Sequence, residues 1–516
     1  MQMQKRHSQS HVFSQVPKAE IPRSSFDRSH GHKTTFDAGY LVPVFVDEAL
    51  PGDTFNLKMT GFSRLATPIF PIMDNMYMET HYFAVPMRLV WDNWQKFNGE
   101  QRNPGDSTDF LVPQMVAPPT TGYDLASLSD YFGIPTGVPG LTHSALWHRA
   151  YNLIWNEWFR DQNMQDSLEV PVDDGPDDPA IYTLQRRGKR HDYFTSCLPW
   201  PQKGPGVQIP LGSVAPVHST NGVSNPSQPT VLSPSGIPGY TPAGAPGDYS
   251  WENQVYVDLS EATAATINSL RQAFQIQKIY ERDARGGTRY TELIKSHFGV
   301  TSPDARLQRP EYLGGGSTPV NISPIPQTSA SGTYAESPQG NLAAIGTSVL
   351  TDHGFTTSFT EHSLIIGVVS VRADLTYQQG LSRMWSRRTR FDFFWPALSH
   401  IGEQAVLQKE IFASGVPAED DVVFGYQERF AEYRYKPSII TGLFRSQAAT
   451  SLDAWHLSQD FATAPVLDST FIVENPPVDR VIAVPSEPHF LFDSFFTVRC
   501  ARPMPVYGVP GLIDHF

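Results

Sequence analysis

Residues 24–85 read SSFDRSHGHKTTFDAGYLVPVFVDEALPGDTFNLKMTGFSRLATPIFPIMDNMYMETHYFAV, and they decide the fold class. The segment 36–46 is rich in β-branched and aromatic residues, which favour strands, and the Pro-Gly-Asp sequence at 51–53 is typical of a turn. Apolar and polar side chains alternate through 55–60, with the period of a half-buried strand. Residues 77–85 are strand-like again. Several strands with no helix between them predict an antiparallel all-β core.

Strand patterns return in the C-terminal third of the chain. Residues 363–375 contain a continuous apolar run, which is typical of a strand covered on both faces. Residues 490–502 form the last clear strand pattern. Because strands near both ends of the chain enclose helical and loop-rich segments, the simplest arrangement is one antiparallel β-sandwich with insertions between its strands.

Residues 88–170 are expected to be a helical insertion. Within it, residues 144–164 show the clearest amphipathic pattern of the chain, and Ser144 is a suitable N-cap. The apolar stripe of this helix is aromatic, which is typical of a core or a subunit contact rather than of a cofactor site. The residues that we assign to a subunit contact are Trp147, Trp155 and Trp158.

Two other segments are expected to be loops. Residues 204–250 are dominated by Pro, Gly and Ser, and Asp248 is their only charged residue. Such a composition cannot supply a core, so we expect a surface protrusion that a helix predicted at 261–285 would anchor; the alternative is a plain linker. Residues 314–348 are rich in Gly, Ser, Thr and Pro, and are expected to form a second long loop.

The composition sets limits on function. The chain has 516 residues, enough for a sizeable core, and its formal net charge is −13. A protein that alone neutralised a genome would be basic, so any nucleic-acid contact must be local. Two cysteines cannot form a disulfide framework or paired zinc ligands. No apolar run reaches the roughly 18 residues of a membrane-spanning helix.

The sequence lacks the common catalytic signatures. It contains no G-x-x-x-x-G-K-[ST] phosphate loop, no G-x-G-x-x-G, no H-E-x-x-H and no G-x-S-x-G. A triad built from distant residues leaves no such signature, because its members need only meet in space. The motif search predicts a protein that is not an enzyme and that binds no cofactor or metal.

Three basic segments are candidates for contact with single-stranded DNA, because phosphates pair with cations and bases stack on aromatic rings. Two of them lie beside aromatic residues, at 186–194 and 383–391, and the third is a polar N-terminal arm, residues 1–33. The alternative for each is a solvated surface or salt bridges between subunits. The candidate residues are Arg186, Arg187, Lys189, Arg190, Arg383, Arg387, Arg388, Arg390, Lys5 and Arg6.

The last residues of the chain are apolar, unlike an ordinary polar tail. Residues 509–516 include Leu512, Ile513 and Phe516. Burial of each large apolar side chain is worth about 1.5–3 kcal/mol, so we expect this segment to be docked. A neighbouring subunit is one candidate partner, and Leu512 and Phe516 are the candidate contact residues.

Three stretches resemble one family. Residues 24–85, the segment FGYQERFAEYRYKPSIITGLFRS at 424–446 and the segment VPGLIDHF at 509–516 are similar to the major capsid protein of the gokushovirus group of microviruses, small phages with circular single-stranded DNA. The similarity covers nearly the whole chain except the region around 212–250. It implies an all-β fold in which a single eight-stranded antiparallel jelly roll, a β-sandwich with insertions, occupies residues 34–516.

The resemblance also implies partners. It implies pentamers and a T=1 icosahedral shell of sixty copies, assembled in the bacterial host cytoplasm, with single-stranded DNA and a small basic DNA-binding protein in the virion. The insertion at 204–250 would project at the three-fold axes, where we expect it to contact a host surface receptor. No membrane partner is expected. A second interpretation is a β-sandwich carbohydrate-binding module or glycoside hydrolase with aromatic clusters.

Overall fold

The structure is a computed structural model that describes residues 22–207, 217–219, 255–257, 267–328 and 340–507. The chain divides into two compact units. The main unit is Met1–Pro199 with Val300–Phe516, and the inserted unit is Trp200–Gly299.

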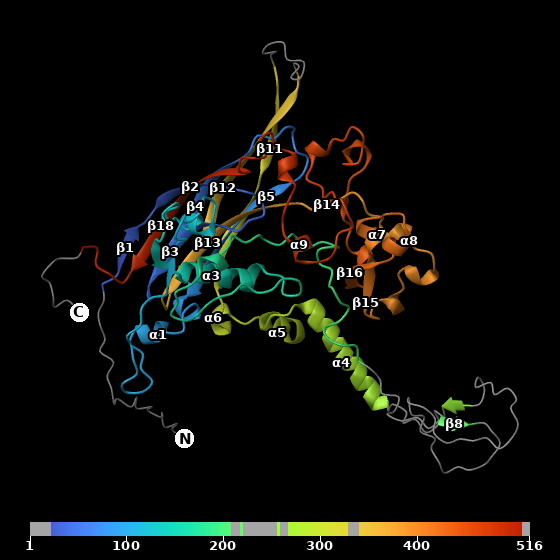
Figure 1. The fold of residues 1–516 in the computed structure, drawn as a ribbon, viewed down its shortest axis with the longest axis horizontal. Coiled ribbons are helices and arrows are strands. Elements are labelled where there is room, and N and C mark those ends of the chain that lie inside the picture. The colour runs from blue at the N-terminus through green and yellow to red at the C-terminus, as the bar shows by residue number, and fades with distance from the viewer. Residues whose placement is uncertain (1–21, 208–216, 220–254, 258–266, 329–339, 508–516) are drawn as a thin grey trace, which may run out of the picture. The chain divides into compact units, whose positions relative to one another are not determined.

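Two antiparallel sheets form the centre of the main unit (Figure 1). The larger sheet has the order β1–β18–β4–β12–β11, and β2 also pairs with β18. Its strands are β1 (Ser24–Asp27), β2 (His30–Phe36), β4 (Thr54–Leu65), β11 (Asn321–Pro326), β12 (Leu342–Ser358) and β18 (Phe490–Arg502). The smaller sheet has the order β10–β5–β13–β3. Its strands are β3 (Val42–Ala49), β5 (Met76–Pro86), β10 (Glu311–Pro319) and β13 (Ser363–Ala373).

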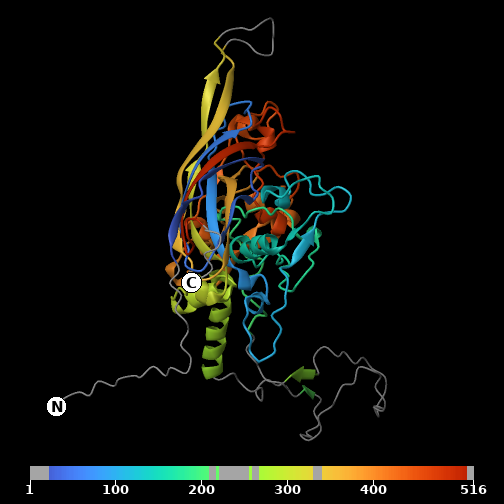
Figure 2. The ribbon, with the colours of Figure 1, turned by 90° about the vertical axis from the view of Figure 1, so that its left-hand side faces the viewer.

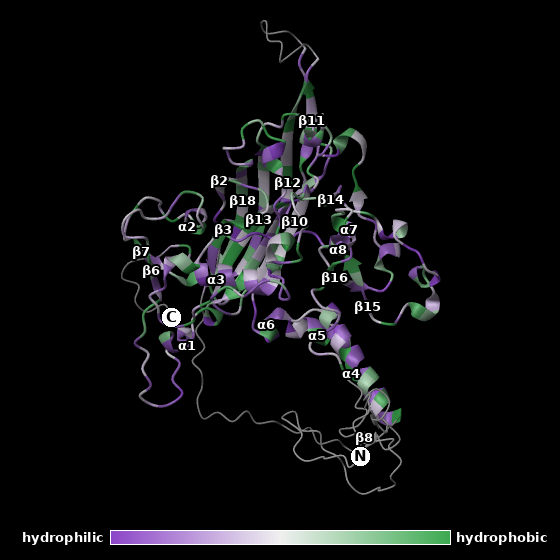
Figure 3. Cartoon of the chain, turned by 45° about the vertical axis from the view of Figure 1, so that its right-hand side comes forward, coloured by the Kyte–Doolittle hydropathy of each residue, from purple (hydrophilic) through white to green (hydrophobic). Residues whose placement is uncertain are grey.

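The core lies between these two sheets. Strand β4 alternates buried and exposed side chains along nearly its whole length, as the pattern at 55–60 predicts, and Phe55, Leu57 and Met59 face the core. Strand β13 is buried at nearly every residue, and β18 spans the predicted last strand. Figure 3 shows hydrophobic residues gathered on the central strands. The prediction of an antiparallel β-sandwich is confirmed.

A second apolar cluster covers the other face of the smaller sheet, which explains why β13 is buried on both faces. It joins Phe83 of β5 and Ile366 of β13 to residues of the 88–170 insertion such as Trp91 and Tyr151. The elements of this insertion are α1 (Trp94–Phe97), β6 (Gln114–Val116), α2 (Leu128–Tyr131), β7 (Thr142–Ser144), α3 (Leu146–Ile154) and a π-helical turn at Trp155–Phe159.

Helix α3 is shorter than predicted. Its N-cap is Ala145 rather than Ser144, because Ser144 is the last residue of β7. The helical path ends at Phe159 rather than at residue 164. The side chain of Asn156 bonds both the N–H and the C=O of Leu168 at 2.8 Å, which requires the chain to turn back soon after the helix.

The prediction of a loop at 314–348 is wrong for most of the described part of that segment. It contains most of β10, all of β11 and the start of β12, and only residues 329–339 lie outside the described residues. The glycines that suggested a loop are needed for close packing, because a Cβ at Gly316 would collide with the ring of His353. Strands β11 and β12 form a hairpin that extends beyond the other strands (Figure 2).

The predicted N-terminal arm, residues 1–33, is partly wrong as well. Strand β1 and the first half of β2 pair with β18, so residues 24–33 belong to an edge of the larger sheet. Polar side chains are common on sheet edges, which is why this segment resembles a free arm in sequence. Residues 1–21, with Lys5 and Arg6, lie outside the described residues.

Short elements fill the remaining chain. In the main unit, helix α6 (Asp304–Leu307) contacts β10. The other short elements lie in the part of the main unit that holds a third apolar cluster, which includes Tyr193, Phe194 and Val406. They are β14 (Thr376–Tyr377), β15 (Glu403–Leu407), α7 (Gln408–Ile411), α8 (Pro417–Asp420), β16 (Val423–Glu428), β17 (Ser438–Ile439) and α9 (Ser469–Ile472). The inserted unit contains β8 (Val217–Ser219), β9 (Val255–Val257), α4 (Ile267–Gly286) and α5 (Tyr290–Phe298). Helix α4 confirms the helix predicted at 261–285 from residue 267 onward.

Candidate nucleic-acid and subunit contact surfaces

The first basic cluster that was a candidate for DNA contact lies inside the main unit. Arg187 and Arg190 pair with the carboxylate of Glu79 on β5, the latter at 3.2 Å, and Arg372 on β13 adds a bond of 2.8 Å. Burial raises the pKa of Glu79, but the three guanidinium groups outweigh it and hold that pKa below its usual range. Burial also lowers the pKa of Arg187 to about 10. The carboxylate is therefore charged and holds three arginines on the sheet.

The other two members of this cluster, Arg186 and Lys189, are held by aromatic rings. The Arg186 guanidinium lies 4.0 Å from the centre of the Tyr40 ring and donates to two backbone carbonyl groups. The Lys189 ammonium lies 4.5 Å from the centre of the Phe471 ring, and burial lowers its pKa. We call Arg186, Arg187, Lys189 and Arg190 the internal arginine cluster. Because its contacts lie within the subunit, this cluster has a structural role in the main unit.

The second basic run begins with two arginines that are also paired. Arg383 donates to Glu410 at 2.9 Å, and Arg387 donates to Glu432 at 3.2 Å. Both guanidinium groups are largely buried. These two residues therefore hold the run in place through ion pairs with the segments that contain α7 and β16.

The rest of the second run is exposed. The Arg390 guanidinium lies 4.4 Å from the centre of the Trp395 ring, and Arg388 extends into solvent. Trp385 is 71% exposed and Phe391 is 62% exposed. Large aromatic side chains with this exposure are typical of an interaction surface. We call this the aromatic–basic surface, and its members are Trp385, Arg388, Arg390, Phe391, Phe393 and Trp395.

A short turn presents the aromatic–basic surface. The Asp392 carboxylate accepts the backbone N–H groups of Thr389 at 2.6 Å and Arg388 at 2.9 Å. These bonds hold the pKa of Asp392 below its usual range. The Asp392 carboxylate is thus bound to the backbone of the turn. The exposed side chains of Arg388 and Arg390 give this surface a local positive charge.

Two exposed tyrosines beside this surface were not among the candidates. Tyr433 and Tyr435 are about half exposed, and the Arg387 guanidinium lies 4.2 Å from the Tyr433 ring. They follow β16 within the stretch 424–446. The alternation of Tyr with Arg434 and Lys436 in that stretch is a sequence signal that could have identified them.

The three tryptophans predicted at a subunit contact pack in the second apolar cluster of the main unit. Trp155 is buried and its indole N–H donates to the carbonyl of Arg186 at 3.2 Å. Trp158 donates to the carbonyl of Pro310 at 2.9 Å, and Trp147 packs against the same cluster. The aromatic stripe was predicted to be part of a core or of a subunit contact, and these contacts favour the core.

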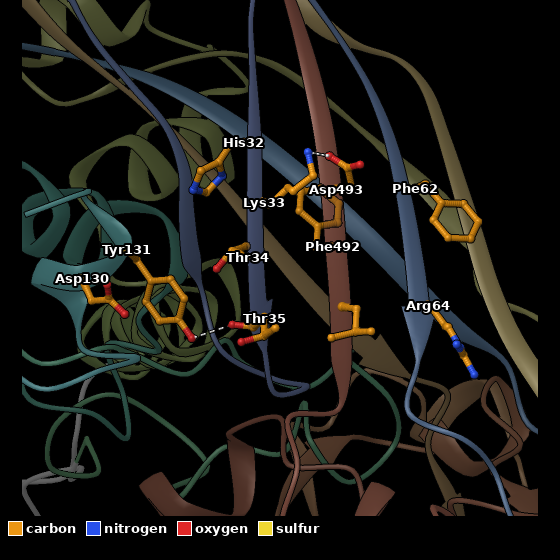
Figure 4. A pocket seen from close by; sticks show the side chains of 11 residues that line it. His32, Lys33, Thr34, Thr35, Phe62, Arg64, Asp130, Tyr131, Phe492 and Asp493 are labelled. Atoms are coloured by element: carbon orange, nitrogen blue, oxygen red, sulfur yellow. Dashed lines mark hydrogen bonds and ion pairs between the residues drawn. The ribbon is translucent and has the colours of Figure 1, made fainter. Parts of the chain in front are cut away.

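The outer face of the larger sheet carries an uncovered apolar stripe. Val349 on β12 lies directly opposite Phe62 on β4, and Leu491 and Phe495 on β18 are diagonal neighbours of Phe62. Each of these side chains is about half exposed. Beside them runs a groove of about 550 Å³ between α2 and the sheet (Figure 4). An exposed patch of this kind is typical of a protein contact.

The inserted unit has its own exposed apolar side chains. On α4, Ile267 is 70% exposed, Phe274 is 63% exposed and Ile279 is 48% exposed. Ile267 and Phe274 are separated by seven residues and therefore lie on one side of the helix. Exposed apolar side chains on one side of a helix indicate a further contact surface.

Four of the predicted contact residues lie outside the described part of the chain. They are Leu512, Phe516, Lys5 and Arg6.

Within the described ranges, no group of three or more His, Cys, Asp or Glu side chains has an arrangement that could hold a metal ion. A search of the same ranges for a helix that is long and apolar enough to span a bilayer finds none.

Comparisons with known proteins give one family. The family described as "Capsid protein (F protein)" matches residues 14–512. The chain is 49% identical to the capsid protein VP1 of Bdellovibrio phage phiMH2K over all of both chains, and 46% identical to that of Chlamydia phage 1 over 97% of each. It is 37% identical to the capsid protein VP1 of Spiroplasma virus 4 over 99% of each. The chain belongs to the capsid protein (F protein) family.

Proposed function

We propose that this major capsid protein assembles as sixty copies into a closed T=1 icosahedral shell around circular single-stranded DNA. Its full-length similarity to three microvirus capsid proteins carries the proposal. A structural, non-enzymatic role in the virion follows from the family. No relative supports the alternative of a carbohydrate-binding module or glycoside hydrolase.

We further propose that the sandwich is a single eight-stranded jelly roll. The support is the strand order. Strands β1 and β2 both pair with β18 and count as one interrupted strand, which gives four main strands in each sheet, with β11 as an added hairpin strand. Successive main strands alternate between the sheets except at β5 and β10, which are neighbours in the smaller sheet.

Within the shell, the aromatic–basic surface is the proposed contact with single-stranded DNA. Exposed Trp385 and Phe391 offer rings for bases, and Arg388 and Arg390 offer charge for phosphates. Because the subunit carries −13 overall, this local contact cannot offset the charge of the genome. A small, strongly basic protein in the particle is therefore a proposed partner. Full particles that contain neither such a protein nor polyamines would contradict this part.

Two apolar surfaces are the proposed subunit contacts. They are the stripe on the larger sheet and the exposed side of α4. A Leu491→Asp variant should fold, because the side chain is already half exposed, yet it should assemble poorly. Thr497→Asp, on an exposed position of the same strand, is the matched control and should assemble normally.

The insertion at 204–250 is the proposed host-attachment element at the three-fold axes. Most of it lies outside the described residues, and its near lack of charge makes it a poor DNA ligand. Replacing residues 218–247 with a short Gly/Ser loop should leave assembly intact and sharply reduce binding to host cells. Unchanged binding would refute the attachment role, and failed assembly would assign the loop a structural role.

Electron microscopy of the expressed protein tests the shell directly. Negative-stain images should show closed shells or pentamers. Monomers under all conditions, with no response to added single-stranded DNA or basic protein, would contradict the proposed function.

A further inference from the structure

A small pocket beside the aromatic–basic surface is lined by more cationic side chains than carboxylates. Its volume is about 170 Å³. Four cationic side chains line it, against three carboxylates. The cations are Arg383, Arg387, Lys409 and Arg429, and the carboxylates are Asp392, Glu410 and Glu432.

The three carboxylates are already engaged. Glu410 accepts from Arg383 and from the hydroxyl of Tyr193, both at 2.9 Å. Glu432 accepts from Arg387 at 3.2 Å and from Gln404 at 2.7 Å. Asp392 accepts two backbone N–H groups of its own turn.

Two of the cations are not fully engaged. Arg429 makes one long bond, 3.4 Å, to the carbonyl of Phe391, and its buried Nε has no hydrogen-bond partner among the described residues. The buried Nε of Arg387 also has no partner in that part of the chain. Lys409 differs, since it pairs with Asp421 at 2.6 Å. A guanidinium group has five N–H donors, so Arg387 and Arg429 retain donors for an additional acceptor.

We propose that this pocket binds a phosphate group of the single-stranded DNA. Two arginines with free donors in a small pocket fit the several oxygens of a phosphate, which guanidinium groups bind through paired hydrogen bonds. Aromatic rings beside the pocket could stack on the base of the same nucleotide. The Arg387 guanidinium lies 4.2 Å from the Tyr433 ring and 5.5 Å from the Phe393 ring, and both rings are half exposed. A phosphate in the pocket leaves its base next to these rings.

This inference deepens the proposed DNA contact and rests on it. Under this inference, Arg387 and Arg429 form one specific phosphate site. Arg388 and Arg390, at the exposed turn, contribute only non-specific positive charge. Arg429 is the better residue to vary, because Arg387 also holds Glu432.

The experiment compares wild-type capsid protein with Arg429→Gln, Arg429→Lys and Arg388→Gln. The first readout is the thermal unfolding midpoint in inorganic phosphate against chloride at equal ionic strength. Phosphate should raise the midpoint of the wild type and of Arg388→Gln by a few degrees, and leave that of Arg429→Gln unchanged. Arg429→Lys should keep part of the rise, since it keeps the charge without the fork of donors.

The second readout is affinity for a fluorescent oligodeoxythymidine. Arg429→Gln should weaken binding about tenfold, as expected for a lost bond to a charged group. If Arg429→Gln responds to phosphate and oligonucleotide like the wild type while Trp385→Ala loses DNA binding, the pocket inference is wrong and the proposed DNA contact stands. If the wild type binds phosphate but no oligonucleotide, the assignment of the pocket to DNA is wrong along with the proposed contact.

Discussion

Two arginine-rich runs of this chain, each beside aromatic residues, end in opposite environments. In the internal arginine cluster at 186–190, Arg187 and Arg190 pair with Glu79, and the other two cations pack on the rings of Tyr40 and Phe471. In the run at 383–390, Arg383 and Arg387 are paired with carboxylates. Arg388 and Arg390 are exposed, together with Trp385 and the adjoining Phe391. The two runs differ in whether a carboxylate from a distant part of the sequence lies beside their arginines. The local sequence of a run therefore does not show whether its arginines have a structural role or form an exposed binding surface.

The largest expected effect follows from removing the charge that holds the internal cluster. Glu79→Gln leaves three buried or partly buried guanidinium groups without their shared carboxylate. Breaking a buried ion pair by removing one partner costs about 3–5 kcal/mol. We therefore expect a loss of that size in the free energy of unfolding, measured by chemical denaturation. Asp374→Asn, which removes a half-exposed partner of Arg190, should cost much less.

The same carboxylate predicts a pH dependence. The pKa of Glu79 is lower in the folded protein than in the unfolded chain, so its stabilising contribution is present above the unfolded pKa. That contribution should be lost as the pH falls through the folded pKa. Denaturation curves from pH 7 down to pH 3 should thus fall more steeply for wild type than for Glu79→Gln. Parallel curves would contradict the assigned role of Glu79.

A smaller effect should come from the exposed run. Trp385→Ala removes a ring that is 71% exposed and is expected to stack on a base. Stacking contributes about 1–3 kcal/mol per base, so affinity for single-stranded DNA should fall by roughly tenfold to a hundredfold. Stability should change little, because the side chain is not part of a core. A variant that unfolds instead of losing affinity would place Trp385 in the structure rather than in the contact.

The smallest effect should be in salt dependence. Each phosphate contact contributes about −0.7 to the slope of log affinity against log salt for single strands. Removing Arg388 or Arg390 should reduce the slope by about that amount, as measured by titration at several salt concentrations. Arg186→Gln belongs to the other run and should leave the slope unchanged. An equal change for Arg186→Gln would remove the distinction between the two runs.

The sequence predicted much of the fold because local patterns encode it. Alternation predicted β4, and the continuous apolar run predicted β13. The errors arose where local composition conflicted with tertiary packing. The glycines of β10 suggest a loop but allow close contact with His353, and the polar strands β1 and β2 gain their order from β18.

The candidate contact residues were predicted less well. The sequence identified both basic runs, but it could not show that Glu79 lies within hydrogen-bond distance of Arg190, more than a hundred residues away. It also could not show that Trp155 and Trp158 donate to carbonyl groups inside their own subunit. Such pairings depend on the full tertiary arrangement, which local patterns do not contain.

Ultraviolet cross-linking of genome-filled particles tests the contrast between the two runs most directly. Trypsin cleaves after Arg390 and Lys409, so Phe391, Phe393 and Trp395 lie in one peptide. The peptide 191–203 carries Tyr193 and Phe194 beside the internal cluster and is the matched control. Mass spectrometry should find nucleotide adducts in peptide 391–409 and none in peptide 191–203. Adducts confined to peptide 191–203 would contradict the account.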